Sequence, residues 1–225
     1  MSPATSYFTP DLFAFFRALK RHNNRDWFLA NKARFEASVR DPMLRFITDF
    51  GPHLARVSLR FVADPRPTGG SMFRIYRDIR FSADKSPYKT HAAAHFFHRA
   101  SKATGHAPGF YMHLAPGECY VGGGLWHPDT AMLVKLRDAM VDSPATWKRA
   151  RRGLELEGQV LSRPPRGFDP KHPLIDDLRR KDFVAGRSFT ERQVCSPRFM
   201  RDVADECRRL GPLVEFLTKA VGLKW

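Results

Sequence analysis

The stretch that decides the fold runs from residue 73 to residue 90: Phe73-Arg74-Ile75-Tyr76-Arg77-Asp78-Ile79-Arg80-Phe81-Ser82-Ala83-Asp84-Lys85-Ser86-Pro87-Tyr88-Lys89-Thr90. Its first half alternates apolar and polar residues, the period that predicts a β-strand. One face of that strand would hold Phe73, Ile75, Arg77, Ile79 and Phe81. Residues 84–87 have turn chemistry and would return the chain into a second extended run. We therefore expect residues 73–81 to be the central strand of a sheet.

Arg77 is the exception on this apolar face. A guanidinium keeps its charge, so its burial there requires a carboxylate, several carbonyl groups or a bound anion as a partner. The hairpin would gather further charged groups and a tyrosine around it, and we predict a ligand-binding group of Arg74, Arg77, Arg80, Asp84, Tyr88 and Lys89. Such a group suits a ligand that bears phosphate or carboxylate.

Two residues of the same stretch could carry chemistry. Asp78 is the candidate general base or magnesium ligand, and Lys85 would stabilise developing negative charge, so both are predicted catalytic residues. A structural alternative stays open, in which the arginines, aspartates and tyrosine form a network that holds the turn. The pattern alone does not choose between a site and such a network.

The order of residues in this stretch, Arg74-x-x-Arg77-Asp78-x-Arg80-Phe81-x-x-Asp84-Lys85-x-x-Tyr88, resembles the signature of a bacterial and fungal family called domain of unknown function 2461. Three other stretches also fit that family's pattern: Asn31-Lys32, Pro108-Gly109-Phe110-Tyr111 and Gly122-Gly123-Gly124-Leu125-Trp126-x-Pro128. Members are similar in length to this chain, so the resemblance covers nearly all of it. It implies no activity, substrate or cofactor, and the cofactor stays unknown.

Length and composition suit one globular domain of ordinary size. The chain has 225 residues, of which 43% are hydrophobic, so it can bury a sizeable core. It has no apolar run near the ~20 residues that span a bilayer and no N-terminal signal segment, so we expect a cytoplasmic protein without a membrane partner. Three cysteines lie far apart, at Cys119, Cys195 and Cys207, which argues against a disulfide framework.

The order of the predicted elements favours an α+β fold. Helical patterns fill residues 8–56, strands and turns fill 57–126, and mainly helical patterns return over 128–225. We expect a single domain over residues 1–225, in which N- and C-terminal helices pack against a mainly antiparallel sheet. Gly211-Pro212 should break or kink the last helix.

A hairpin is predicted with its turn at Ala115-Pro116-Gly117-Glu118. Alternation would turn Tyr111 and His113 to the face on which Tyr120 lies. His91 and His95 would share one face of the preceding strand. Because the histidines lack compact metal-ligand spacing, we predict no metal site.

Three glycines, Gly122, Gly123 and Gly124, precede a helix that Pro128 would open. Glycines before a helix N-terminus expose backbone N–H groups to an anion, so Gly123 and Gly124 join the predicted ligand-binding residues. The run lacks the lysine and hydroxyl residue of a P-loop. The close approach of another backbone would explain the glycines equally well.

The charge of the chain leaves other partners open. A net charge of +15 suits nucleic acid. The excess is spread out, however, because Lys and Arg outnumber Asp and Glu by 11 to 6 in residues 1–70, 9 to 6 in 71–144 and 18 to 11 in 145–225. We predict a small anionic ligand, with a nucleic-acid-binding module as the alternative and a scaffold domain as a third possibility. No nucleophile signature supports covalent catalysis.

Overall fold

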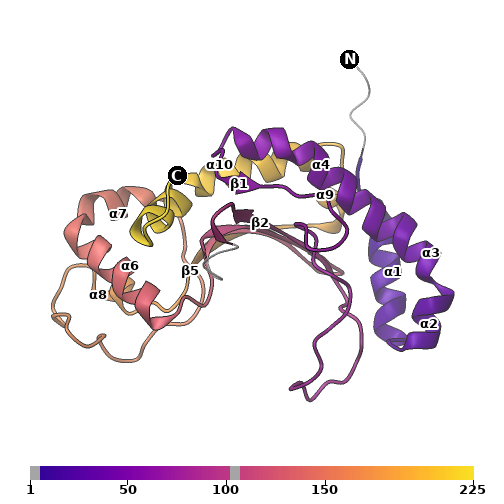
Figure 1. Cartoon of the computed structure of the whole chain (residues 1–225), viewed down its shortest axis with the longest axis horizontal. Helices are drawn as coiled ribbons and strands as arrows, with labels where there is room; N and C mark the ends of the chain where they lie inside the picture. The colour runs from indigo at the N-terminus through magenta and orange to yellow at the C-terminus, as the bar shows by residue number, and fades with distance from the viewer. Residues whose placement is uncertain (1–5, 102–106) are drawn as a thin grey trace.

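The computed structural model describes residues 6–101 and 107–225. Its centre is one five-stranded antiparallel sheet with the order β1-β2-β3-β4-β5. The strands are β1 (Phe61–Val62), β2 (Ala92–His98), β3 (Gly109–Ala115), β4 (Glu118–Leu125) and β5 (Phe183–Phe189). Figure 1 shows the sheet as the curved middle of an arch, with helices over its convex side and at both ends. This arrangement confirms the predicted α+β fold.

The helices at the N-terminal end of the arch begin where their caps predict. α1 (Pro10–Arg21) has proline at its first position, and α2 (Arg25–Ala30) is capped by Asn24, whose side chain accepts a hydrogen bond of 2.9 Å from the backbone N–H of Trp27. The chain continues through α3 (Lys32–Phe35) and the π-helical turn η1 (Glu36–Arg40) into α4 (Asp41–Ala55). The phenylalanines of these helices are buried in the core.

Helices after β4 build the other end of the arch and most of its convex cover. α6 (Thr130–Asp142), α7 (Pro144–Ala150) and α8 (Ile175–Leu178) precede β5, and the short α9 (Glu191–Val194) follows it. α10 (Phe199–Ala220) then crosses the convex side of the sheet beside α4 (Figure 1). Within the described ranges, no helix is long and apolar enough to cross a membrane.

The predicted break at Gly211-Pro212 does not occur, because α10 is helical across both residues. A proline in a helix clashes with the carbonyl four residues earlier and with the Cβ of the residue before it, and Gly211 removes the second clash because it has no Cβ. The hydrogen bond that Pro212 cannot donate is offset by burial on both sides, where Leu210, Leu213 and Val214 are 0% exposed. The same Gly-Pro pair occurs inside α4 at Gly51-Pro52.

The predicted hairpin of β3 and β4 is confirmed, and its register fixes which side chains reach the core. Ala115 pairs with Glu118 across the turn, where Gly117 has a φ of +77°. Phe110, Met112 and Leu114 point to the convex side and are 0% exposed beneath the helices. Their neighbours along β3 must therefore face the concave side.

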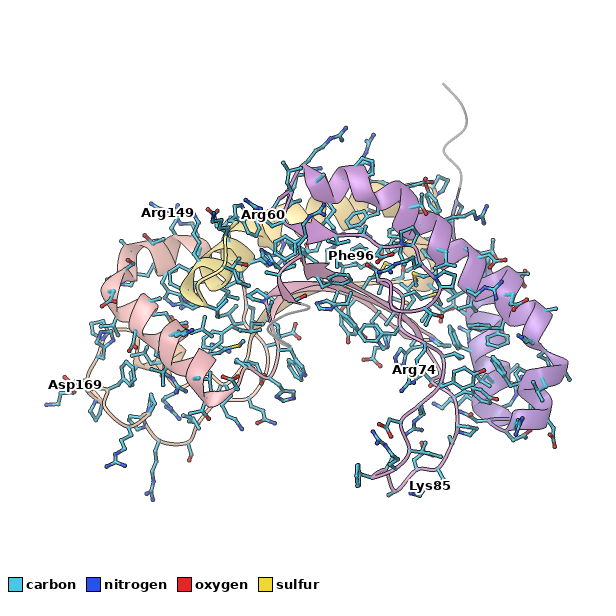
Figure 2. All side chains as sticks on the ribbon, in the orientation of Figure 1. Arg60, Arg74, Lys85, Phe96, Arg149 and Asp169 are labelled. Carbon is cyan, nitrogen blue, oxygen red and sulfur yellow. The ribbon has the colours of Figure 1, made fainter. Side chains whose placement is uncertain are left out.

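The prediction of a central strand at residues 73–81 is wrong. Residues 71–90 instead form an irregular arm that leaves the concave side of the arch, with Lys85 near its far end (Figure 2). The strand-type pairing of the arm in the described structure is limited to isolated bridges, Met72 with Ala94 of β2 and Tyr76 with Tyr88. Burial does not follow the predicted face either, because Ile75 is 8% exposed and Phe81 is 96% exposed. Alternation indicated an extended backbone, but no neighbouring strand covers it.

Candidate functional site

Six rings gather on the concave side of the sheet. This ring cluster consists of Phe73, His91, His95, Tyr111, His113 and Tyr120. The register brings them together, because Tyr111 pairs with His95 on β2 and His113 pairs with Tyr120 on β4. The arm adds Phe73, whose ring centroid lies 6.0 Å from that of Tyr111.

Contacts within the ring cluster hold its members in fixed orientations. His113 stacks on Tyr120 with centroids 4.9 Å apart and planes 8° apart, and its Nδ1 is hydrogen-bonded to the Tyr111 hydroxyl at 3.1 Å. The ring of His91 lies 4.3 Å from that of His113. Beside the cluster, Gly122 of β4 pairs with Gly186 of β5, so this part of the concave face is bare backbone.

The rings of the cluster are uncharged at neutral pH. Burial, and then the charges of His113 and Lys89, lower the pKa of His91 from 6.5 to about 4, against a small opposing effect of Glu118. Burial also lowers the pKa values of His95 and His113. The pKa of Tyr111 is raised by burial and by Tyr120. The cluster therefore presents neutral aromatic faces rather than positive charge.

The lowered pKa of His91 predicts a pH dependence of stability. The unfolded state takes up this proton near pH 6.5 and the folded state only near pH 4, so the stabilising term is complete above pH 6.5 and is lost as the pH falls towards 4. We expect this one group to cost about 1–2 kcal/mol at pH 5 relative to pH 7. Urea unfolding of wild type and His91→Gln at pH 7, 6 and 5 measures this cost. If the free energies of unfolding of the two proteins fell by the same amount between pH 7 and pH 5, the lowered pKa of His91 would be contradicted.

Ion pairs within the arm occupy four of its eight predicted site residues. Arg77 pairs with Asp84, and Arg80 pairs with Asp78 at 2.7 Å. Hydrogen bonds from Ser86 and from Arg77 lower the pKa of Asp84, and hydrogen bonds from Arg80 lower that of Asp78. A carboxylate held in this way is a weak base. These pairs are those expected of a network that shapes the arm.

Arg74 and Lys89 differ from the other cations of the arm. Neither has a carboxylate within 4.0 Å among residues 6–101 and 107–225. The Nζ of Lys89 donates to the Arg74 carbonyl at 3.1 Å and lies 5.2 Å from the centroid of the Phe73 ring. Burial and the charge of Arg74 lower the pKa of Lys89. Two cations without a carboxylate within 4.0 Å in the described ranges therefore stand where the arm leaves the sheet, beside the ring cluster, and Figure 2 labels one of them, Arg74.

The remaining predicted site residues lie apart from this group. Lys85 is exposed near the end of the arm, with its Nζ donating to the Ile79 carbonyl at 3.0 Å. Tyr88 is 4% exposed and stacks on Phe28 of α2 with centroids 4.1 Å apart. Gly123 and Gly124 lie within β4 rather than before a helix.

The glycines of β4 are explained by close packing. A Cβ on Gly123 would lie 2.9 Å from the Phe110 ring and 3.2 Å from Val214 of α10. At Gly124 it would lie 2.0 Å from the Phe183 carbonyl oxygen of β5. The distances of 2.9 Å and 2.0 Å are shorter than real Cβ atoms show, so these glycines let neighbouring elements approach β4.

Sequence reasoning did not select the ring cluster as a site. The available signal was alternation, which correctly placed Tyr111 and His113 on the face of Tyr120. The sequence could not indicate that the two ends of the arm, which lie beside the sheet and are called its root here, bring Phe73, Arg74 and Lys89 to that face. In the part of the chain that the structure describes, no three His, Cys, Asp or Glu side chains are grouped to hold a metal ion.

Comparison with known proteins identifies the family of the chain. The search of curated proteins and the search of solved structures both gave no match. The family model described as "Conserved hypothetical protein (DUF2461)" matches residues 11–216, nearly the whole length. The chain therefore belongs to the DUF2461 family.

Proposed function

We propose that the protein binds an anionic ligand that carries a planar ring, such as a nucleotide. Arg74 and Lys89 hold the anionic group, and the ring cluster stacks on the ring of the ligand. The observation that carries this proposal is the position of Lys89, which has no carboxylate partner in the described ranges and lies 5.2 Å from the Phe73 ring.

Electrostatics favour an anion at this position. The charge of Arg74 lowers the pKa of Lys89, so each cation disfavours the other. An anion that contacts both relieves the repulsion, and its hydrogen bonds to charged donors are about twice as strong as those between neutral groups. Arg77 and Arg80 are weaker candidates, because each would first have to leave its aspartate.

The planar ring of the proposed ligand would stack on the ring cluster. Phe73 is 43% exposed, and it stands against His95 and Tyr111, with centroids 6.5 and 6.0 Å away. Aromatic faces that are partly open to water gain free energy when another ring covers them. The proposal is one of binding, since Asp78 is occupied by Arg80 and Lys85 lies near the far end of the arm.

Thermal-shift titration with adenosine 5′-monophosphate tests the proposal, because a ligand of the folded state raises its melting temperature. We expect the nucleotide to stabilise wild type, and Arg74→Gln or Lys89→Gln to weaken its binding about tenfold through the loss of one charge-assisted hydrogen bond. Lys135→Gln is the matched control, because it removes the same charge from an exposed position of α6.

Two further probes separate the anion from the ring. Adenosine has the planar ring without the anionic group, and inorganic phosphate has the anionic group without the ring. Each should therefore stabilise wild type less than the nucleotide does. Equal binding by Lys89→Gln and Lys135→Gln would overturn the proposed site. Phosphate that stabilises the protein as well as the nucleotide does would overturn the role of the ring cluster.

A further inference from the structure

We infer that the ligand of the concave face is single-stranded nucleic acid, and that the arm extends the site with its own stacking ring and cations. This inference rests on the proposed function and names the class of its ligand. Its independent support is the outer half of the arm, which the nucleotide site at the root does not use.

The outer half of the arm presents an aromatic ring to solvent. Among the described residues, the outermost backbone hydrogen bond that joins the two sides of the arm runs from the N–H of Arg77 to the carbonyl of Pro87 at 2.9 Å, so residues 78–86 lie beyond it. In this segment Phe81 is 96% exposed, with the guanidinium carbon of Arg80 5.8 Å from its ring centroid. Nothing in the described ranges covers this phenylalanine, and the rest of the arm does not need it for its own packing.

Rings and cations alternate along the arm. Tyr76 is 53% exposed and Phe73 is 43% exposed, so with Phe81 the arm carries three open aromatic rings at intervals along its sequence. Five Lys or Arg residues lie in the segment 71–90 against two aspartates. Three of these cations, Arg74, Lys85 and Lys89, have no carboxylate within 4.0 Å among the described residues.

This alternation fits a nucleic acid strand better than a protein or a lipid surface. A strand offers a base face and a phosphate in every unit, so it matches aromatic rings interleaved with Lys and Arg. Protein docking surfaces have a contiguous apolar centre and few lysines, whereas cations separate the rings of the arm. The chain as a whole carries +15, which favours a polyanion.

The strand must be single. Stacking on the open rings requires exposed base faces, and a duplex hides all but its terminal ones. The bare backbone at Gly122 and Gly186 leaves room beside Tyr111 and Tyr120 for a further base. A duplex would reach only the cations, and its binding would not depend on the rings.

Fluorescence anisotropy with a labelled oligothymidylate of about 12 nucleotides tests the inference, since sites of this type cover roughly 4–16 nucleotides. We expect the oligonucleotide to bind at least tenfold more tightly than adenosine 5′-monophosphate. Its affinity should fall with salt at a logarithmic slope of about −2 to −3, as three or four phosphate contacts predict. Phe81→Ala should weaken oligonucleotide binding about fivefold or more and leave nucleotide binding unchanged.

Leu59→Ala is the matched control, because Leu59 is also a large exposed apolar residue, at 75%, and lies outside the arm. A nucleotide that binds as tightly as the oligonucleotide would overturn this inference and leave the proposed function standing. So would a Phe81→Ala variant that binds the oligonucleotide like wild type, or polyphosphate that binds as tightly as the oligonucleotide. If neither the nucleotide nor the oligonucleotide binds, the proposed function and the inference fall together.

Discussion

Gly124→Ala should destabilise the protein by about 4 kcal/mol or more, enough to prevent folding. Gly124 has a φ of +139°, a region that residues with a Cβ rarely adopt. The added Cβ would also lie 2.0 Å from the Phe183 carbonyl oxygen and 2.8 Å from the Val184 Cα. Both neighbours are backbone atoms of β5, so neither can move without disrupting the pairing of β4 with β5. Urea unfolding or the yield of folded protein measures the effect.

Gly117→Ala is the control that separates backbone strain from the clash. Gly117 lies in the turn between β3 and β4 with a φ of +77°, and no atom lies within 4 Å of its added Cβ. We expect it to cost about 1 kcal/mol, the effect of a left-handed conformation alone. If both alanine variants lost the same amount, the close approach of β5 would not be the reason for the glycine at position 124.

The arm was predicted to be a central strand, and this difference shows which part of the fold could be predicted from alternation alone. Alternation along residues 73–81 correctly indicates extended backbone, but it does not say whether another strand lies beside it. In β3 the same alternation was sufficient, because the Pro116-Gly117 turn supplied a partner next to it in the chain. Residues 73–81 also have a returning segment next along the chain, but the two are joined by a single bridge, Tyr76 with Tyr88, and do not form a ladder in the described structure.

The charged residues of the arm show the same limit. Their sequence order predicted one shared pocket, whereas the structure divides them into ion pairs and cations that have no carboxylate within 4.0 Å among residues 6–101 and 107–225. Arg80 reaches Asp78 two residues away, and Arg77 reaches Asp84 across the loop, whereas Arg74 and Lys89 have no carboxylate within 4.0 Å among the described residues. Such a division depends on where the arm folds back, which spacing alone does not determine. The mixture of Arg and Asp therefore predicted that charged side chains interact within this segment, but it did not predict which of them form ion pairs.

Tyr88→Ala should cost about 3–4 kcal/mol, because Tyr88 is the residue that anchors the arm to the body. Its ring is 4% exposed and lies against Phe28 with centroids 4.1 Å apart. Asn23 adds two hydrogen bonds, donating to the Tyr88 carbonyl at 2.9 Å and accepting from its N–H at 3.1 Å. Loss of the ring opens a cavity between the arm and α2. Urea unfolding of wild type and variant measures the difference.

Tyr76→Ala is the matched control, since Tyr76 forms the bridge with Tyr88 but is 53% exposed. Its truncation should cost less than about 1 kcal/mol, because little buried area is lost. Tyr88→Phe separates the structural role of Tyr88 from the predicted ligand contact. The Tyr88 hydroxyl has no hydrogen-bond partner in the described part of the chain, so this variant should keep both stability and nucleotide binding. Weakened binding by a fully stable Tyr88→Phe would show instead that the hydroxyl contacts the ligand, and would return Tyr88 to the binding site.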